Sequence, residues 1–507
     1  MRFYLTTPIY YVNATPHIGH AYTTIAADIL ARHHRQRGDE TFFLTGTDEH
    51  GTNIPRVAAE AGLDVKEFVD RNAAAFQEMT RRVNASNDFF IRTTDPRHKA
   101  AVQEFVQRIY DAGEIYEGVY SGLYCPRCEA FYSEAELVDG RCPVHGIVPE
   151  HVEEKNWFFR LSAYQDRLLE LYDANPEFVL PSFRYNEARS FIVQGLDDIS
   201  VSRASEKWGV SVPWDPEQVI YVWVDALINY WSALAFARDG EDLRAELWPE
   251  VRHLLAKDIL KFHCVIWPAL LLAAGLDVPK QLFVHGYLLF DERKMSKSLG
   301  NVIDPLDLVD VYGADSVRFY LIRAVPFGQD GNVSTTGVHE RYERELGNDL
   351  GNLLSRTTAM LARYRNGRVP GKPEGDGGGA DALAALNRDV ASSLDAFDVT
   401  AGLERIWQQV RALNALVEQR KPWELAKDDA RADELDRTLY ELADGLRAVA
   451  VALAAYLPET APRILEALGQ PGDLAWENVA YGRTAPAERI GAAEPLFPRV
   501  DPPVIAA

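Results

Sequence analysis

The chain has 507 residues, of which 47% are hydrophobic and 25% charged, and its formal net charge is −22 at pH 7. The length predicts roughly three domains, the composition predicts an ordinary globular protein, and the charge argues against one that coats nucleic acid indiscriminately. The longest apolar run, residues 262–276, contains His263 and Pro268 and is too short to span a membrane. Asn13 and Pro16 interrupt the apolar start of the chain, so no signal peptide is indicated and we expect a cytoplasmic protein.

The N-terminal part of the chain alternates strand-like and helix-like runs. These runs are Phe3–Thr7, Ala21–Arg35, Thr41–Thr45, Val57–Gly62 and Val65–Asn84. The alternation predicts an α/β fold with a doubly wound, Rossmann-like parallel sheet, whose ligands bind at the carboxyl ends of the strands. His17 follows the first strand and the segment Asp48–Gly51 follows the second, so we expect both at that edge.

The segment Pro16-His17-Ile18-Gly19-His20 lies where the first predicted strand gives way to a helix. A helix N-terminus presents unpaired backbone N–H groups and a positive dipole end, which together bind anions. His17 and His20 are three residues apart and therefore share a helical face, and Gly19 lets a base or ribose approach the backbone. The segment alone is weak evidence, because a His pair at this spacing is more often an ordinary surface pair.

Three of the four cysteines form a cluster with a histidine. Cys125 and Cys128 form one C-x2-C pair, and Cys142 and His145 form a C-x2-H pair thirteen residues later. This spacing is typical of a zinc knuckle, in which two tight turns point four ligands at one tetrahedral ion, and a full ligand set indicates a structural role. The alternatives are a set of incidental thiols, or His151 in place of His145.

The middle of the chain carries a second candidate motif. Residues from about 119 to 212 have short β-like segments such as Asn156–Leu161 and are expected to be an insertion that splits the α/β domain. The α/β pattern resumes with Val219–Val224 and then Phe283–Gly286. Lys294-Met295-Ser296-Lys297-Ser298 follows in a polar, loop-like stretch, where two ammonium groups are suited to neutralising a departing pyrophosphate. A solvated Lys-Ser loop is the alternative interpretation.

After Val333 the sequence is almost wholly helical. Residues 370–379 are rich in Pro and Gly and are expected to be a loop inside a helical bundle, and the tail after Pro471 indicates no function. Residues 350–372 carry five cations and no carboxylate, which fits either an RNA contact or a basic helix face without a partner.

Together, the His17–His20 and Lys294–Ser298 segments resemble the HIGH and KMSKS signatures of class I aminoacyl-tRNA synthetases. From Arg2 to about Leu465 the chain resembles the methionyl-tRNA synthetases of bacteria. The matching segments are Tyr10–Asn13, Thr47–Thr52, Tyr221–Ala226, Lys257–Ile259 and Phe283–Tyr287, besides the two signatures. The resemblance implies a split catalytic domain (1–118 and 216–292), a connective insertion with the knuckle (119–215), a segment with the second signature (293–345) and an anticodon-binding bundle with the tail (346–507).

The resemblance also implies ATP-dependent attachment of methionine to its tRNA through a methionyl-adenylate, with Mg²⁺ accompanying the ATP and one structural Zn²⁺ per chain. It assigns His17, His20, Lys294 and Lys297 to catalysis, and these four with Gly19 and Asp258 to ATP. The family commonly has Gly before the Lys-Asp pair, and this chain has Ala256, whose methyl group would crowd the ribose. The residues that the resemblance assigns to methionine are Ile9, Tyr11, Asp48, Trp223, Ala226, Leu227, Tyr230, Ile259, Phe262 and His263.

An unbranched thioether must be selected by shape and by contact with aromatic rings, which these side chains would supply. By residue type alone, core packing is the favoured role of the aromatic residues, and Asp48 is equally suited to capping a helix. In the helical part the resemblance assigns Asn352, Arg356 and Trp423 to the anticodon, since bases are recognised by stacking and edge hydrogen bonds. Ordinary bundle packing is the alternative for Trp423. The additional tRNA-binding barrel of dimeric relatives is missing after the bundle, so we expect a monomer.

Three rival functions would share some of these features. A different class I synthetase would share the ATP signatures but not the Trp223–Ala226 segment or the knuckle. A small-metabolite nucleotidylyltransferase also uses HxGH chemistry but has no need of the helical bundle. A non-enzymatic RNA-binding relative is disfavoured because both histidines and both lysines are present.

Overall fold

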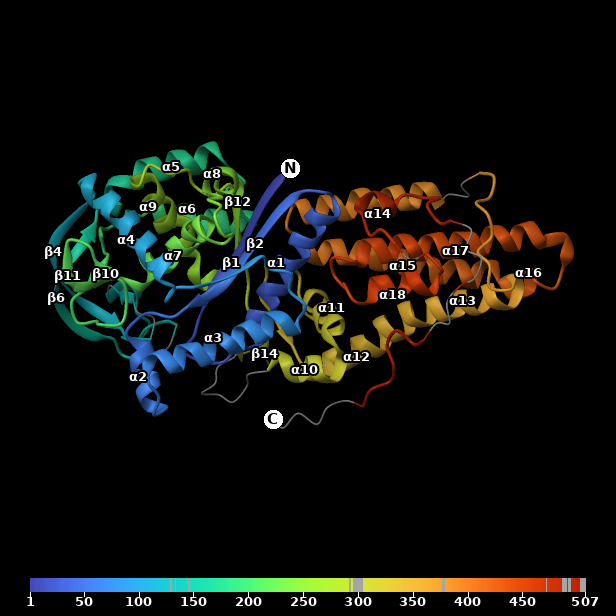
Figure 1. Cartoon of the computed structure of the whole chain (residues 1–507), viewed down its shortest axis with the longest axis horizontal. Coiled ribbons are helices and arrows are strands. Elements are labelled where there is room, and N and C mark those ends of the chain that lie inside the picture. Colours follow the sequence, from blue (N-terminus) through green and yellow to red (C-terminus); the bar gives the residue numbers. More distant parts are fainter. Residues whose placement is uncertain are drawn as a thin grey trace.

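A computed structural model describes residues 1–127, 130–132, 134–144, 146–290, 293–294, 304–375, 379–470, 472–485, 490 and 494–501. It is elongated, with a sheet-containing part at one end and a helical bundle at the other (Figure 1). None of the helices in these ranges is both long and apolar enough to cross a lipid bilayer.

The centre of the first part is a six-stranded sheet in the order β3-β2-β1-β12-β13-β7, and all of its strand pairs are parallel. Its strands are β1 (Arg2–Tyr11), β2 (Glu40–Asp48), β3 (Phe89–Arg92), β7 (Val179–Leu180), β12 (Val251–Ala256) and β13 (Gln281–His285). Successive residues of a strand point to opposite faces, and both faces are apolar here. Phe3 and Leu5 join the core on one face, and Tyr4 joins the core on the other. The predicted α/β architecture is therefore confirmed.

Helices cover both faces of this sheet. On the face of Phe3 and Leu5 lie α1 (Ile18–Gln36) and α3 (Val65–Arg82), which contribute residues to the same core. On the other face lie α4 (Pro96–Asp111), α7 (Val222–Ser232) and α9 (Trp267–Ala273). The short α2 (Asn53–Glu60) follows β2 and precedes α3.

The segment expected as an insertion contains two small sheets. An antiparallel sheet has the order β5-β4-β6-β8, and a three-stranded sheet has the order β10-β11-β9. The strands are β4 (Ile115–Cys125), β5 (Ala130–Tyr132), β6 (Glu150–Phe159), β8 (Ile199–Ser200), β9 (Ser202–Arg203), β10 (Ser211–Val212) and β11 (Asp215–Ile220). Between β6 and β8 the chain forms α5 (Gln165–Ala174), β7 and α6 (Ser182–Val193), and β7 pairs with β13 of the main sheet.

One expected element is wrong. The run Val219–Val224 was expected to resume the α/β pattern as a strand, but only Val219 and Ile220 are extended, and they belong to the small sheet. Helix α7 begins at Val222, so Trp223 and Val224 are helical. An unbroken apolar run does not distinguish a buried strand from a buried helix, and α7 is buried along almost its whole length.

The second part of the chain is helical, as predicted. Its first two helices, α10 (Pro305–Tyr312) and α11 (Ala314–Ala324), lie in the chain between two parts of a small sheet, which are β14 (Leu288–Phe290) with β15 (Arg293–Lys294) and then β16 (Gly331–Val333). The helices that follow are α12 (Thr335–Arg341), the π-helix η8 (Tyr342–Gly351), α13 (Asn352–Arg365), α14 (Gly379–Asp395), α15 (Val399–Arg420), α16 (Pro422–Leu425), α17 (Ala432–Leu453) and α18 (Thr460–Ala467). The described part of the Pro- and Gly-rich stretch, residues 370–375, follows α13 and precedes α14 in the chain.

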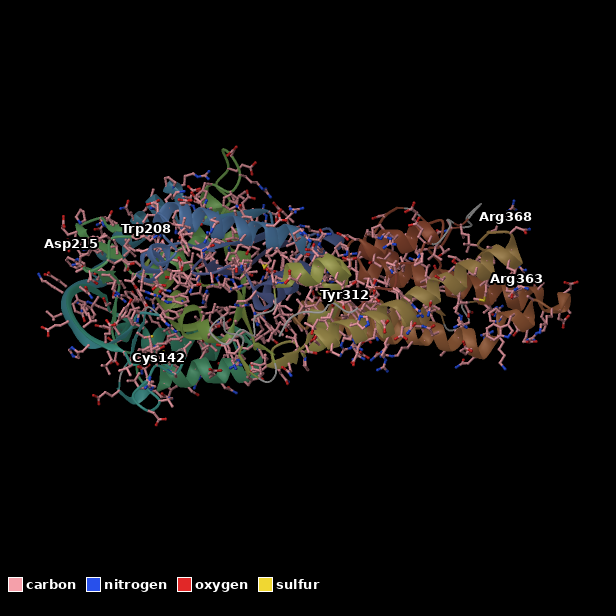
Figure 2. The ribbon with its side chains drawn as sticks, turned by 90° about the horizontal axis from the view of Figure 1, so that it is seen from below. Cys142, Trp208, Asp215, Tyr312, Arg363 and Arg368 are labelled. Atoms are coloured by element: carbon pink, nitrogen blue, oxygen red, sulfur yellow. The ribbon has the colours of Figure 1, made fainter. Side chains whose placement is uncertain are left out.

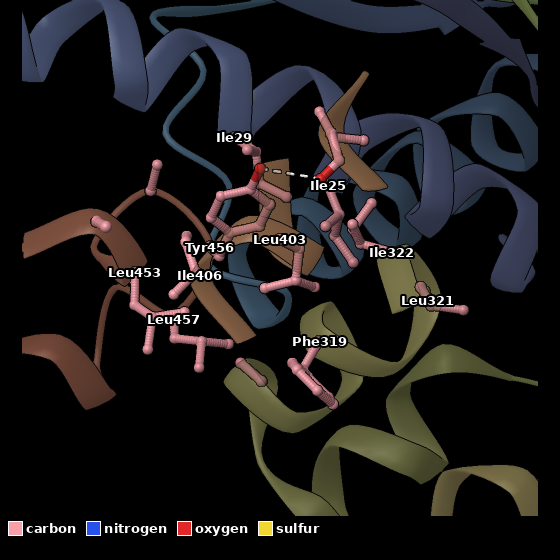
Figure 3. Packing of buried hydrophobic residues seen from close by; sticks show 14 of the residues in the cluster. Ile25, Ile29, Phe319, Leu321, Ile322, Leu403, Ile406, Leu453, Tyr456 and Leu457 are labelled. Carbon is pink, nitrogen blue, oxygen red and sulfur yellow. Dashed lines mark hydrogen bonds between the residues drawn. The ribbon is translucent and has the colours of Figure 1, made fainter. Parts of the chain in front are cut away.

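The two parts share one hydrophobic core. Ile25 and Ile29 of α1 belong to the same cluster as Phe319 of α11 and Leu403 of α15 (Figure 3). The buried Tyr456 hydroxyl donates a hydrogen bond to the Val399 carbonyl at 2.9 Å in this region. The helix that begins at the histidine signature is thus packed directly against the bundle.

Candidate active site

His17 and His20 form a double cap at the start of α1. The N-cap residue His17 accepts a hydrogen bond from the Gly19 N–H at Nδ1 (3.1 Å), and the His17 N–H donates to Nδ1 of His20 (3.1 Å). The two rings are stacked, with their centroids 3.8 Å apart. Because each Nδ1 accepts a backbone hydrogen bond, a neutral ring carries its proton on Nε2. Both imidazoles are therefore held as Nε2–H donors beside a helix N-terminus, a geometry suited to phosphate.

The structure refines the expectation for these residues. His17 caps the helix rather than sharing one of its faces, and stacking brings the two rings together. Gly19 also leaves room for the His17 ring, besides allowing a nucleotide to approach the backbone. A Cβ at this position would lie 2.9 Å from Cε1 of His17. A side chain at position 19 would displace His17 from its capping hydrogen bond.

The ends of β1 and β2 bring Tyr11 and Asp48 together. These residues are register partners, and the Val12 N–H donates to the Asp48 carbonyl at 3.1 Å. The pairing of β1 shifts between Thr6 and Ile9, and such irregularities reorient side chains at the ends of strands. Ile9 and Tyr11 pack against the cores on opposite sides of the sheet.

An aromatic cluster lies on the α7 side of this edge, and we define it as Trp223, Tyr230, Phe262 and His263. The rings of Trp223 and Phe262 stack 3.9 Å apart and are within 6° of parallel. The Tyr230 hydroxyl lies 2.7 Å from Nε2 of His263. Burial raises the pKa of Tyr230, and the carboxylate of Asp48 raises it further, so Asp48 lies near this cluster.

The hydrogen bonds of His263 fix its neutral form. Its Nδ1 lies 3.0 Å from the Ile259 carbonyl, which only accepts, so Nδ1 carries the proton and Nε2 accepts from Tyr230. Burial lowers the pKa of His263 to about 4. At neutral pH the aromatic cluster thus carries no imidazolium charge, which suits an uncharged side chain.

A five-residue π-helix, Phe262–Ile266, presents Phe262 and His263, and the sequence pattern did not predict it. Such segments often occur at functional sites. Ala226, Leu227 and Tyr230 lie in α7 and are buried, whereas Trp223, Ile259 and Phe262 remain partly accessible. Several residues that the family resemblance assigns to methionine therefore come from α7 and from the segment that follows β12.

Asp258 occupies the neighbouring strand end. It is exposed, in the short turn that follows β12. Burial raises the pKa of Tyr287, and the charge of Asp258 raises it further, so the two side chains lie near each other. Ala256 is the register partner of His285 at the end of β13. Asp258 therefore lies at the same sheet edge as His17.

No sequence pattern assigned a role to the contact between Thr23 and His285. The Thr23 hydroxyl on α1 lies 2.9 Å from Nε2 of His285, whose Nδ1 lies 2.8 Å from the Gly286 carbonyl. His285 is buried, and burial lowers its pKa to about 4. This contact ties the helix that begins at the histidine signature to the end of β13. The family-like segment Phe283–Tyr287 was the only sequence signal for it.

Much of the predicted lysine signature lies outside the described residues. Backbone pairing places Lys294 opposite Leu289 in an antiparallel strand pair, which differs from the expected loop at this residue. The side chain of Lys294 and the whole of Lys297 lie outside the described part of the chain. Their contribution to ATP binding remains a prediction.

The described half of the cysteine cluster is compatible with a metal. Cys125 and Cys142 are buried and not disulfide-bonded. The Cys142 sulfur lies 3.6 Å from the Tyr132 hydroxyl, and Tyr132 belongs to β5, which pairs with β4 at Cys125. The Gly146 N–H donates to the Cys142 carbonyl at 2.8 Å. Within the described ranges, which leave out Cys128 and His145, no group of three metal-ligating side chains occurs.

The predicted anticodon residues lie in the bundle, far from the sheet. Arg356 on α13 pairs with Glu418 in the last turn of α15 (2.7 Å), and Trp423 follows shortly after α15 ends. Asn352 donates to the Asn348 side chain at 3.2 Å. Trp423 is half-buried against the bundle core. Figure 2 shows Arg363 and Arg368 of the basic stretch towards the end of the molecule remote from Trp208 and Cys142.

Comparison with known proteins gives consistent matches along the chain. A family profile described as "tRNA synthetases class I (M)" matches residues 3–147 and 132–358. The chain is 44% identical over 504 residues to a protein named methionine–tRNA ligase from Caldanaerobacter subterraneus subsp. tengcongensis, covering 98% of this chain and 79% of that protein. The protein of the same name from Streptomyces coelicolor is 42% identical over 524 residues, covering 98% of this chain and 97% of that protein.

Solved structures agree with these sequence matches. Mycobacterium tuberculosis methionyl-tRNA synthetase in complex with methionyl-adenylate superposes with a TM-score of 0.94 at 42% identity, covering 98% of this chain and 100% of that chain. The apo form of the same synthetase gives a TM-score of 0.87 at 39% identity, covering 99% of each chain.

Proposed function

The chain belongs to the methionyl-tRNA synthetases of class I, and from this premise we propose how its residues join methionine to tRNA. The carboxylate of methionine attacks the α-phosphorus of ATP, the bond to the β-phosphate oxygen breaks, and methionyl-adenylate and pyrophosphate form. The terminal ribose hydroxyl of the tRNA then takes the acyl group and AMP leaves. No covalent enzyme intermediate is needed, so the protein accelerates the reaction by positioning and charge stabilisation.

The phosphates of ATP bind at the N-terminus of α1. The observation that carries this proposal is the double cap, which holds His17 and His20 as paired N–H donors at a positive helix end. Asp258 binds the ATP ribose, and Lys294 and Lys297 stabilise the charge of the departing pyrophosphate together with Mg²⁺. The position of Asp258 near Tyr287, at the sheet edge of His17, supports its assignment.

Methionine binds against the aromatic cluster. Asp48 accepts from its α-ammonium group, and the thioether lies among Tyr11, Trp223, Tyr230 and Phe262, where sulfur–aromatic contacts are favourable. The neutral state of His263 supports this proposal, since a buried imidazolium would disfavour an uncharged ligand. Ile9, Ala226, Leu227 and Ile259 complete the apolar surroundings.

The cysteine cluster holds a structural Zn²⁺ through Cys125, Cys128, Cys142 and His145. Two buried thiols beside neighbouring turns support the proposal, because thiolate sulfur is a preferred zinc ligand. Metal analysis of the purified protein tests it, with about one zinc per chain expected. Cys142→Ser should lose the zinc and Cys264→Ser, which changes a buried cysteine of the main core, should keep it. Equal zinc contents in both variants would exclude the cluster as the metal site.

The helical bundle binds the anticodon of the tRNA through Asn352, Arg356 and Trp423. Their distance from the sheet supports this division of labour, since the anticodon and the acylated end lie at opposite ends of a tRNA. We also propose that the enzyme acts as a cytoplasmic monomer.

Pyrophosphate exchange into ATP, assayed with each of the amino acids in turn, tests the proposed reaction. We expect exchange with methionine alone, and acylation of tRNA specific for methionine. Exchange with a different amino acid would indicate another class I specificity. No exchange with any amino acid would indicate a relative that binds RNA without catalysing adenylation.

A further inference from the structure

A buried carboxylate joins two histidines beneath the proposed methionine site. Asp225 is fully buried, as are His50 and His98. Oδ2 of Asp225 lies 2.6 Å from Nδ1 of His50, and Oδ1 lies 2.8 Å from Nε2 of His98. The second ring nitrogen of His98, Nδ1, lies 2.7 Å from the Ser232 hydroxyl. We call Asp225, His50 and His98 together the Asp225 bridge.

The charge of the bridge is set by its hydrogen bonds. Burial by itself would raise the pKa of Asp225, but the two histidines outweigh burial and hold that pKa well below its usual value. Asp225 is thus a carboxylate that accepts from Nδ1–H of His50 and from Nε2–H of His98. With Nδ1 at hydrogen-bond distance from the Ser232 hydroxyl, both ring nitrogens of His98 have a partner.

The bridge connects three elements that carry or adjoin the proposed site. His50 lies two residues after Asp48, beyond the end of β2, and His98 lies in the first turn of α4. Asp225 lies in the first turn of α7, the helix that also carries Trp223, Ala226, Leu227 and Tyr230. The N-cap residue of α7, Tyr221, makes no side-chain capping hydrogen bond. The bridge is therefore a polar link between the segment after β2, which begins beside Asp48, and the helix that would contact the thioether.

The cost of this arrangement argues against a role in stability alone. Nε2 of His50 has no hydrogen-bond partner within the described part of the chain, although the ring is buried. A buried polar atom without a partner destabilises the fold, and well-packed apolar residues often replace buried ion networks with a gain in stability. Fixing the orientation of neighbouring groups is the better-attested use of such a network.

We propose that His50 and His98 are positioning residues for the amino-acid substrate. By holding Asp225 from two sides, they fix the position of α7 relative to Asp48, so that the ammonium and thioether contacts form together. This inference rests on the proposed methionine site. It distinguishes the two histidines from His17 and His20, which act on the phosphates of ATP.

Two pairs of variants test the proposal in steady-state pyrophosphate exchange. Leu at position 50 or 98 removes the donor to Asp225. Asn at position 50 keeps a donor, because its Nδ2 can replace Nδ1 of His50, and Gln at position 98 does so because its Nε2 can replace Nε2 of His98. We expect His50→Leu and His98→Leu to raise the KM for methionine about 10- to 100-fold, the effect of one lost charge-assisted hydrogen bond. The KM for ATP and kcat should change less than about threefold. His50→Asn and His98→Gln should recover most of the methionine affinity.

The double variants test whether the histidines act through the shared carboxylate. In an Asp225→Leu background, His50→Leu should have little further effect, because coupled residues are not additive. A purely structural role would instead lower kcat, ATP affinity and melting temperature together, and the Asn and Gln variants would not rescue. That outcome, or fully additive effects with Asp225→Leu, would overturn the proposal. Absence of methionine-dependent exchange in the unaltered enzyme would refute the proposed function instead.

Discussion

His17 and His20 combine two tasks in one pair of side chains. Their Nδ1 atoms accept backbone hydrogen bonds and cap α1, which leaves Nε2 of each ring as the donor side. Ser is a commoner cap, but its short side chain has no ring N–H that extends beyond the cap to an anion. The signature therefore needs imidazole at these positions for catalysis, whereas the helix needs only an acceptor.

His17→Ser separates these two tasks. Ser is a good N-cap, so the free energy of unfolding should change by less than about 1 kcal/mol. The lost donor to the phosphate should slow pyrophosphate exchange about 10²- to 10³-fold, as for other groups that stabilise transition-state charge. Exchange kinetics and thermal unfolding of the same preparation measure both effects. A variant that keeps full exchange activity would remove His17 from the proposed phosphate site.

His33 lowers the stability of the protein in acid. It is fully buried against Trp476, and neither ring nitrogen has a hydrogen-bond partner in the described part of the chain. Burial lowers its pKa from 6.5 to about 3. Between these values the unfolded chain binds the proton and the folded chain does not, so stability falls as the pH falls from about 6.5 towards 3.

His33→Leu should therefore be more stabilising in acid than at neutral pH. At pH 5 the substitution removes a proton-linked penalty of about 2 kcal/mol, which is nearly absent at pH 7. Chemical denaturation of both proteins at pH 5 and pH 7 measures the difference. Equal effects of the substitution at the two pH values would show that His33 is not held neutral in the fold.

At the level of elements, the strand and helix order of the first part follows from the sequence pattern. Alternating apolar runs predict β1, α1, β2 and α3, and turn residues mark their ends. The same pattern failed at Val219–Val224, where an apolar run without periodicity became the end of a strand and the start of α7. It also gave no sign of the π-helix at Phe262, because one extra residue in a helical turn leaves no compositional trace.

The site was only partly predictable for a related reason. The two signatures and the knuckle are local patterns, so they can be found by spacing alone. The Asp225 bridge joins residues up to 175 positions apart. His50 and Asp225 lie in two of the family-like segments, but nothing in the sequence paired them with each other or with His98. The role of His285 depends on Thr23 of a different element and was equally hidden.

Helix α13 gives a test of the proposed anticodon contact. The pair of Arg356 and Glu418 is exposed, so its loss should hardly affect stability. Arg356→Gln should leave methionine-dependent pyrophosphate exchange unchanged and lower the kcat/KM for tRNA about 5- to 150-fold, the range expected for one base contact. Arg388→Gln on α14 is the matched control, since Arg388 is also exposed and paired with a carboxylate. Equal charging by both variants would contradict the assignment of Arg356.

Across the whole molecule, one buried arginine joins the sheet to the bundle. Arg318 on α11 is fully buried and pairs with Asp28 of α1 at 2.7 Å. Its other donors reach the Val83, Ala455 and Tyr456 carbonyls at 2.8–3.1 Å. The charge of Arg318 opposes the effect of burial and contributes to the lowered pKa of Asp28. The position of α1, and with it the histidine signature, is thus fixed relative to the bundle.

Arg318→Met tests this link. The variant leaves the Val83, Ala455 and Tyr456 carbonyls without this donor and removes one of the two arginines that pair with Asp28, the other being Arg32 at 2.7 Å. It should therefore lose about 3–5 kcal/mol of stability, because each buried polar group left unsatisfied costs about 1–3 kcal/mol. Arg405→Met is the control. Arg405 is exposed, and within the described part of the chain its side chain hydrogen-bonds to the Gln408 side chain alone. Denaturant unfolding followed by circular dichroism compares the two. Similar unfolding midpoints would show that the buried pair does not join the two parts energetically.

The most direct test of the proposed site is a crystal structure with a non-hydrolysable methionyl-adenylate analogue. We expect the phosphate of the analogue beside the rings of His17 and His20, its ammonium group on Asp48 and its thioether against Trp223 and Tyr230. A phosphate bound away from the start of α1, or an ammonium group held by a carboxylate other than Asp48, would contradict the assignment of this sheet edge as the place where methionine and ATP react.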